Sequence, residues 1–267
     1  FFLQPEQVSD LPWFARALLK TAKFGAAAPI VDSGSRVSAA LSSLGPSYIK
    51  LGQFLSTRPD VIGAKRAFEL KSLQDRLPPF SMAEARDIIR ANLGQSAEEL
   101  FTEFGEPVAA ASIAQVHKAL TRDGEQVAVK ILRPGVEKRF ADDLSSFFFA
   151  ARMMERFSRE ARRLRPVAAV EMLDHSMKLE LDLRMEASAI SEMAKATADD
   201  PNFRLPAVNW PLTGRQVLTT EWIEGTPISD IASLRAKGFD LKALGDNIIQ
   251  SFLRHAIRDG FFHADMH

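Results

Sequence analysis

A lysine on a short apolar strand is the residue whose position most suggests chemistry. Residues 127–132 (VAVKIL) follow Asp123-Gly124, a dipeptide typical of tight hairpin turns. Because side chains alternate along a strand, Lys130 shares one face with Ala128 and Leu132. An ammonium group among small and apolar side chains needs an anionic partner, since an unpaired buried charge is costly. The pattern predicts either an anion-binding lysine or an edge hairpin whose lysine extends to solvent.

A helical stretch further along the chain carries three carboxylates. Residues 180–186 (ELDLRME) place Asp182 and Glu186 four positions apart, and therefore on one helix face. Glu180 is about 200° away from Asp182 on an ideal helix, so it points elsewhere unless the helix bends. Such carboxylates are usually solvated, but the neighbouring residues are apolar, so we expect some of them at a buried face.

Prolines mark the boundaries of another helix that has chemical interest. Pro46 suits the first turn of a helix over 46–58, and Pro59 ends it. Lys50 and Gln53 share a face of this helix. Gly52 between them costs helix stability, which indicates close approach by another part of the backbone.

The elements that must position these residues are read from caps and periodicity. Capping boxes at 81–84 (SMAE) and 96–99 (SAEE) predict two helices, which end near Gly94 and Gly105. We also expect helices over 137–163, from Pro166 to about Ala198 and over 241–258, and a strand over 215–220 that leads into an extended link.

The composition excludes some classes of protein. The chain of 267 residues has 34 Lys+Arg and 34 Asp+Glu, which argues against a nucleic-acid binder that relies on bulk charge. It has no cysteine, which excludes disulfides and fits a reducing compartment. No apolar run approaches the ~18 residues of a membrane span. Because the chain runs from Phe1 to His267 without an initial Met, we expect a fragment or a trimmed chain.

A basic helix face is expected near the beginning of the chain. Residues 9–24 read as a helix on which Arg16, Lys20 and Lys23 cluster. This pattern is typical of a helix on an anionic membrane surface. The alternative is a helix packed on the core, with its basic face in solvent.

Four motifs in the expected order make the chain resemble the UbiB family of atypical protein-kinase-like proteins, which includes the mitochondrial coenzyme Q kinase-like proteins. The resemblance covers roughly residues 40–267. Val-Ala-Val-Lys at 127–130 resembles the strand signature whose lysine holds ATP phosphates. The four motifs are Lys-x-Gly-Gln at 50–53, an alanine-rich loop at Ala109, Ala110, Ala111 and Ser112, Glu-x-Asp at 180–182, and the start of a catalytic loop at 263–267 (HADMH).

The resemblance implies a catalytic role for three residues. Lys130 is implied to contact the α- and β-phosphates, Glu186 to pair with Lys130, and Asp265 to be the catalytic aspartate. The alanine-rich loop replaces a glycine-rich phosphate loop, and it should be stiffer because alanine adopts positive φ less readily than glycine. The implied nucleotide-binding residues are Ala109, Ala110, Ala111, Ser112, Ala128, Lys130, Glu221, Trp222 and Ile223.

A second set of residues is implied to restrict the acceptor site. In the family, the helix of Lys50 and Gln53 is implied to lie across the place where a protein substrate would bind. Glu180 and Asp182 are implied to lie near it, available to Lys50 or to a metal. An occluded site favours ATP hydrolysis, or transfer to a small or lipid-like acceptor, over phosphorylation of proteins.

The implied fold class is α+β and protein-kinase-like, with a small antiparallel sheet in the N-lobe. We expect a helical extension over 1–100, an N-lobe with inserted helices over 101–224, and an incomplete helical C-lobe over 225–267. The ligands of Mg²⁺ in kinases include an Asn and an Asp that would follow His267, so no metal ligand is expected within this chain. The chain alone is therefore predicted to be inactive, although its parent protein can be active.

The implied function is an atypical kinase or ATPase that uses ATP and Mg²⁺ in ubiquinone biosynthesis. Expected partners are prenylated quinone precursors or anionic membrane lipid, and other proteins of ubiquinone biosynthesis, but not nucleic acid. The expected location is the cytoplasmic side of a bacterial inner membrane, with the full-length parent anchored at its C-terminus.

Two alternatives belong to other classes. A pseudokinase-like module would bind nucleotide or a prenyl lipid and act by changing shape, without turnover. A helical lipid carrier or scaffold would use Lys130 only as a surface residue. Turnover separates the first alternative from an enzyme, and a lack of nucleotide binding would support the second.

Overall fold

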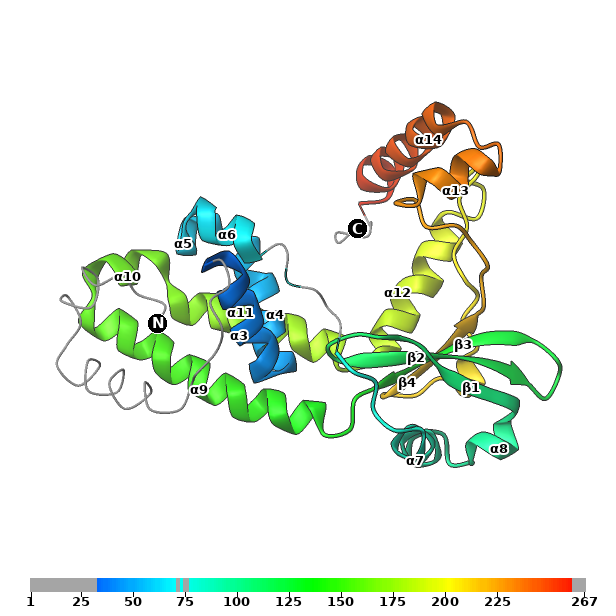
Figure 1. Ribbon diagram of the computed structural model, residues 1–267, viewed down its shortest axis with the longest axis horizontal. Coiled ribbons are helices and arrows are strands. Elements are labelled where there is room, and N and C mark those ends of the chain that lie inside the picture. Colours follow the sequence, from blue (N-terminus) through cyan, green and yellow to red (C-terminus); the bar gives the residue numbers. More distant parts are fainter. Residues whose placement is uncertain (1–32, 71–72, 74–76, 261–267) are drawn as a thin grey trace. The chain divides into compact units, whose positions relative to one another are not determined.

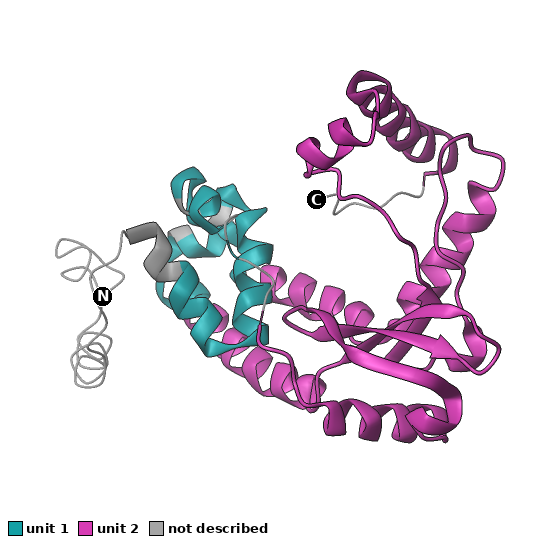
Figure 2. Ribbon diagram, turned by 45° about the vertical axis from the view of Figure 1, so that its right-hand side comes forward, with its two compact units in different colours: residues 1–75, 154–166 teal, residues 76–153, 167–267 magenta. Residues whose placement is uncertain are grey.

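The computed structural model describes residues 33–70, 73 and 77–260, and the chain divides into two compact units (Figure 1, Figure 2). Unit 1 comprises residues 1–75 and 154–166, and unit 2 comprises residues 76–153 and 167–267. The boundaries expected near residues 100 and 224 stay a prediction. The helix expected over 9–24 lies outside the described residues.

Unit 1 is helical in its described part. Pro46 begins α4, and this helix ends at Ser56, before Pro59, as predicted; Pro59 itself begins α5. Gly52 on α4 is buried, and a Cβ atom built there would lie 2.6 Å from Leu73 Cδ1 and 2.9 Å from Leu41 Cδ1. The groups that approach this glycine closely are therefore leucine side chains, not another backbone as predicted. The helices are α3 (Ser33–Leu44), α4 (Pro46–Ser56), α5 (Pro59–Ile62), α6 (Ala64–Leu70), α10 (Arg159–Leu164) and the last residues of α9.

Unit 2 is built on a four-stranded antiparallel sheet in the order β1-β2-β3-β4. Its strands are β1 (Phe101–Ala110), β2 (Ala114–Thr121), β3 (Gln126–Leu132) and β4 (Val217–Glu221). The hairpin predicted at Asp123-Gly124 joins β2 to β3, and Gly124 has φ 83°. Val127, Val129 and Ile131 point to the buried face of β3, so Lys130 belongs to the opposite face, as predicted.

The buried face of the sheet packs against α7 (Met82–Leu93). Ala85 and Ile89 of this helix join Val129 and Ile131 in one core cluster. Both predicted capping boxes are present: Ser81 and Glu84 begin α7, and residues 96–99 begin α8 (Ala97–Leu100). These contacts place α7 beneath the face opposite Lys130 (Figure 1).

The prediction of a helix from Ser96 to near Gly105 is correct only for its first turn. The α8 helix stops at Leu100, and β1 begins at Phe101. Phe101 is only 3% exposed in the core, and Phe104 stacks on the buried imidazole of His117 at 4.6 Å between ring centroids. Burial of these two rings and the ladder to β2 outweigh the local helix signal.

Two helices replace the single helix predicted from Pro166 to about Ala198. The first is α11 (Pro166–Glu180) and the second is α12 (Leu183–Ala196). The break comes at Asp182, whose side chain accepts a hydrogen bond from Arg184 N–H and caps α12. Before them, α9 (Val136–Phe157) runs from unit 2 into unit 1.

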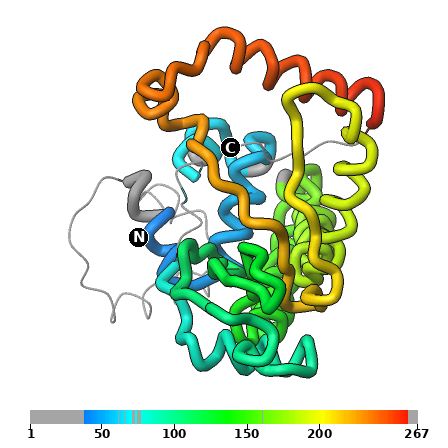
Figure 3. The backbone as a smooth tube through the Cα atoms, turned by 90° about the vertical axis from the view of Figure 1, so that its right-hand side faces the viewer, coloured from blue at the N-terminus to red at the C-terminus, as the bar shows by residue number. Residues whose placement is uncertain are grey.

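The last described elements follow β4 through an extended link. They are α13 (Ile231–Ala236), α14 (Leu241–Arg254) and a π-helical turn (His255–Asp259), and a short 3-10 turn (Trp210–Leu212) precedes β4. Figure 3 shows that the end of α14 lies beside the loop that follows α12. Among residues 33–70, 73 and 77–260, no helix is both long and apolar enough to span a membrane.

Candidate functional site

Lys130 and Glu186 form an ion pair at the centre of the candidate site. Lys130 lies on β3, between Val116 of β2 and Leu218 of β4. Its Nζ atom is 2.9 and 2.8 Å from the two carboxylate oxygens of Glu186, in the first turn of α12. The two side chains are 31% and 42% exposed, so the ammonium group is paired and still open to a ligand from solvent.

Asp182 fixes the place where α12 begins, and therefore the position of Glu186. The Asp182 carboxylate accepts hydrogen bonds from the backbone N–H of Arg184 at 3.2 Å and from its guanidinium at 2.9 and 2.6 Å. These bonds from Arg184 lower the pKa of Asp182, so it stays ionised at neutral pH. Leu183 N–H donates to Arg215 O at 2.8 Å, which ties the cap to the segment before β4.

The alanine-rich segment is the tight connection between β1 and β2. Ala109 and Ala110 are the last residues of β1 and pair with Val116 and Gln115. Only residues 111–113 lie outside the strands, and Ala111 N–H donates to Ala114 O at 2.8 Å. In the described part of the chain only two non-glycine residues have positive φ, and neither belongs to this segment. Ala109 and Ala110 therefore belong to β1 and only Ala111 belongs to the short turn, and the stiffness expected of this segment stays a prediction.

Arg133 holds this turn from the end of β3, a contact that sequence reasoning missed. Its Nε and one terminal nitrogen donate to Ala111 O at 3.0 and 2.8 Å, and its backbone N–H donates to Ile113 O at 2.8 Å. The guanidinium also donates to Leu77 O at 3.4 Å and lies over the Phe80 ring, 5.8 Å from its centroid. An arginine three residues after Lys130 is the only sequence signal, and its partners are 22 and 56 positions away.

Two buried polar residues of β2 were also missed. Gln115 accepts a hydrogen bond from Phe80 N–H at 2.9 Å, and its amide nitrogen lies 2.9 Å from His117 Nε2. Because an amide nitrogen only donates, His117 accepts at Nε2 and donates from Nδ1 to Gly105 O at 2.8 Å. Burial lowers the pKa of His117, which favours this neutral form. Two polar residues at strand spacing on an otherwise apolar face are the signal that could have revealed them.

The link after β4 is held by contacts of its own. Glu221 N–H donates to Ala207 O at 2.8 Å, and Trp222 N–H donates to Gln126 O at 3.0 Å. Lys118 Nζ lies 4.8 Å from the centroid of the Trp222 ring. Arg204 contacts the Glu221 carboxylate and lowers its pKa. Two of the three link residues that are implied to bind nucleotide therefore already have protein partners for their backbone N–H groups.

A cavity of about 700 Å³ opens beside this link, away from Lys130. Most of its lining is apolar and comes from α13, α14 and the loop after α12, with Phe203, Ile228 and Phe252 among the larger side chains. The hydroxyl of Ser251, a residue that is 5% exposed, is buried in its wall with no hydrogen-bond partner.

The remaining predicted site residues are on other elements or outside the described residues. Lys50 and Gln53 are on α4 in unit 1, and Glu180 is the exposed last residue of α11 in unit 2. Asp265 falls in 261–267, outside the described residues. No group of three His, Asp or Glu side chains that could hold a metal ion occurs in the described part.

Comparison with known proteins identifies the class to which this fold and site belong. The family model of the ABC1 atypical kinase-like domain matches residues 72–267. A protein of Marinobacter nauticus named "Probable protein kinase UbiB" is 41% identical over 90% of this chain and 44% of its own length. Its namesake in Pseudomonas paraeruginosa is 40% identical over 96% of this chain and 49% of its own length. The solved structure of an Rv3197–erythromycin complex from Mycobacterium tuberculosis is 31% identical, with a TM-score of 0.48, over 82% of this chain and 53% of that one.

The α+β fold with its small antiparallel sheet is therefore kinase-like, as predicted. More particularly, the chain belongs to the ABC1 atypical kinase-like family, and the resemblance to UbiB proteins is confirmed. The chain spans about half the length of the curated relatives it matches.

Proposed function

We propose that this chain provides the nucleotide-binding part of an atypical kinase or ATPase that supports ubiquinone biosynthesis. The observation that carries the proposal is the Lys130–Glu186 ion pair, in which a strand lysine meets a glutamate of a neighbouring helix. This is the pair that protein kinases need in place for phosphoryl transfer. Family membership and the printed names of the relatives support the same reading.

The residues present fit an ATP molecule. Glu186 fixes the Lys130 ammonium group on a face where both side chains remain partly exposed, so the lysine can contact the α- and β-phosphates. The alanine turn, held by Arg133, covers the phosphates, and Ala128 leaves room for the adenine on the same face as Lys130. Of the link residues, Ile223 is the one we assign to the adenine edge, since Glu221 and Trp222 donate elsewhere.

ATP supplies the phosphoryl group, and Mg²⁺ neutralises its charge. Asp265 orients the attacking oxygen and accepts its proton. By analogy with protein kinases, we assign the metal to an Asn and an Asp that would follow His267 in the parent protein. Lys50, Gln53, Glu180 and Asp182 are proposed to restrict the acceptor to water or to a small or lipid-like molecule.

The setting is proposed from the same family. The relatives are bacterial proteins, and we assign this one to the cytoplasmic side of the inner membrane. Its proposed partners are prenylated quinone precursors or anionic membrane lipid, together with other proteins of ubiquinone biosynthesis.

The experiment that tests this function is steady-state ATP hydrolysis by the parent protein, before and after Lys130→Ala. We expect turnover that Lys130→Ala abolishes and that the exposed-lysine control Lys242→Ala retains. The 267-residue chain by itself is expected to show none. A steady ATPase rate from this chain that is abolished by Lys130→Ala would contradict our placing of the metal ligands after His267.

A second candidate function is a module that binds nucleotide or a prenyl lipid without turnover. The apolar cavity beside the link favours it, because its lining suits an apolar ligand more than a phosphate. Binding of Mg-ATP by the parent protein without any hydrolysis would select this candidate.

A further inference from the structure

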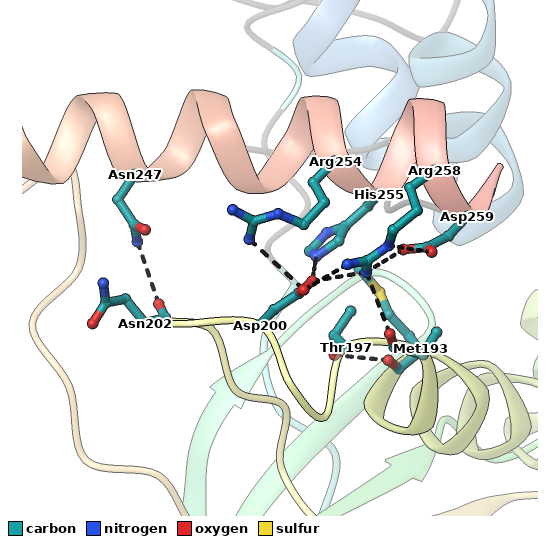
Figure 4. A network of polar contacts seen from close by, with 10 residues as sticks. Met193, Thr197, Asp200, Asn202, Asn247, Arg254, His255, Arg258 and Asp259 are labelled. Atoms are coloured by element: carbon teal, nitrogen blue, oxygen red, sulfur yellow. Dashed lines mark hydrogen bonds and ion pairs between the residues drawn. The ribbon is translucent and has the colours of Figure 1, made fainter.

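Asp200 gathers three cationic or titratable side chains from the end of one helix. It lies in the loop after α12, and its side chain is only 5% exposed. Its carboxylate accepts hydrogen bonds from the Arg258 guanidinium at 2.7 and 2.9 Å, and lies 3.0 Å from His255 Nε2 (Figure 4). Arg254 is 3.8 Å away.

The cationic and titratable side chains of this cluster surround the buried carboxylate of Asp200, and Arg258 makes further contacts. Arg258 also donates to the Asp259 carboxylate at 2.7 and 2.8 Å and to Ala196 O, at the C-terminal end of α12, at 3.3 Å. The hydrogen bonds from Arg258 lower the pKa of Asp200, which keeps the carboxylate ionised. One arginine therefore binds both the loop and the last turn of α12.

The cluster joins α12, which carries Glu186, to the π-helical turn that follows α14. The first turn of α12 holds Glu186 against Lys130, and Asp200 follows the last turn of the same helix. On the other side, Arg258 and His255 belong to a π-helical turn, a rare form that often occurs at functional sites. In the sequence, the catalytic-loop motif with Asp265 begins five residues after Arg258.

We propose that Asp200 is a positioning residue that links α12 to the end of α14. Through this link, the position of Glu186 against Lys130 and the position of residues 254–260, which precede the Asp265 motif in the sequence, are set together. The proposal deepens the function proposed above and rests on it, because it assigns Asp200 to the same nucleotide site. Asp200 itself lies at the far end of α12 from Lys130 and is assigned no contact with the nucleotide.

Neighbouring contacts should keep a variant folded. Phe203 packs its ring edge on His255, with 4.5 Å between ring centroids, and Asn247 donates to Asn202 O at 3.3 Å. Neither contact depends on the Asp200 charge. Asp200→Asn keeps the shape of the side chain, removes its charge and replaces one acceptor oxygen with an amide donor.

The test is amide hydrogen exchange of this chain with and without Mg-ATP, for the wild type, Asp200→Asn and the control Asp246→Asn. Asp246 is an exposed carboxylate of α14 that pairs with Lys242 at 2.9 Å. In the wild type and the control, we expect Mg-ATP to slow exchange at β3, at α12 and at residues 254–260. In Asp200→Asn, the slowing at β3 should remain, with nucleotide affinity changed less than threefold, and the slowing at 254–260 should disappear.

If Asp200 had only a structural role, Asp200→Asn would leave the effect of Mg-ATP on exchange at residues 254–260 unchanged. If Mg-ATP slows exchange at 254–260 as strongly in Asp200→Asn as in the wild type, the proposal is overturned. If Asp200→Asn does not fold, as judged by circular dichroism, Arg258→Lys replaces it, since lysine keeps the charge but loses the two-pronged geometry.

Failure of the proposed function gives a different result. In that case Mg-ATP slows exchange nowhere, even at β3 of the wild type. The link is then tested by comparing the exchange rates of the wild type and Asp200→Asn without nucleotide. Asp200→Asn must then speed exchange at least tenfold both in the last turn of α12 and at residues 254–260. An increase confined to 254–260, or none, overturns the link.

Discussion

Lys130 and Glu186 are 56 positions apart in the sequence, yet the Lys130 ammonium group lies within 2.9 Å of both Glu186 carboxylate oxygens. The strand β3 and the helix α12 that carry these residues are each held by other contacts. The positions of the two side chains therefore do not depend on the ion pair itself. Because both side chains are partly exposed, the pair adds little to stability and leaves the ammonium group available to an anion.

Glu186→Gln should therefore affect binding more than folding. The free energy of unfolding is expected to change by less than about 1 kcal/mol, as for other partly exposed ion pairs. The affinity for Mg-ATP should fall about tenfold, because the lysine loses the group that orients it. Chemical denaturation and calorimetric titration measure the two quantities, with Glu192→Gln, later on α12, as the control. A large loss of stability with unchanged affinity would mean that the pair is structural.

Arg133 is predicted to control the alanine turn. Arg133→Ala removes both hydrogen bonds to Ala111 O, and loss of these bonds from a charged donor should weaken Mg-ATP binding by roughly tenfold, which corresponds to about 1.4 kcal/mol. Arg133→Lys should recover part of the affinity. Arg235→Ala on α13 is the control for loss of an exposed arginine. Unchanged binding in Arg133→Ala would show that the turn does not cover a nucleotide.

His117 should make stability depend on pH. Burial lowers the pKa of His117 in the folded protein, below the ~6.5 of an unfolded chain. As the pH falls below about 6.5, the unfolded state takes up a proton that the folded state refuses, so this contribution to stability is present above pH 6.5 and is lost toward the lowered pKa. Urea unfolding of the wild type and His117→Gln between pH 5 and 8 should show the difference between them shrinking as the pH falls. His175→Gln, at an exposed imidazole, controls for histidine loss; a constant difference would contradict the assignment of a buried neutral imidazole.

Two helical glycines should respond oppositely to alanine. Gly245→Ala on α14 has nothing within 4 Å of the new Cβ and should raise the free energy of unfolding by about 0.5–1 kcal/mol. Gly52→Ala brings its Cβ within 2.6 Å of Leu73 Cδ1 and should lower it by about 1–2 kcal/mol, because overpacking outweighs the gain in helix propensity. Denaturation curves of the two variants give the comparison. Stabilisation by Gly52→Ala would show that the leucines move aside freely.

Local signals in the sequence predicted the elements that are determined locally. The hairpin at Asp123-Gly124, the cap of α7 and the proline at the start of α4 all lie where short-range rules place them. The face of Lys130 followed from the strand period alone. Its partner was reached only through the family resemblance, because no local rule connects residues 56 positions apart.

Long-range packing determines the parts of the fold that sequence analysis predicted wrongly or missed. Phe101 extends a strand into what looked like a helix, because its ring fills the core beside Val129. The Asp200–Arg258 pair spans 58 positions and joins two segments that each look like solvated surface. Arg133 similarly acts on a carbonyl that no residue pattern marks.

The most direct test of the central claim is thermal unfolding of this chain with and without Mg-ATP, beside Lys130→Ala and Lys242→Ala. At a concentration of about 100 times its dissociation constant, Mg-ATP should stabilise the wild type by ~2.7 kcal/mol, and the unfolding temperature should rise by several degrees. Lys242→Ala should keep this rise and Lys130→Ala should lose it. An equal rise in Lys130→Ala, or none in the wild type, would contradict the placing of a nucleotide at the Lys130–Glu186 pair.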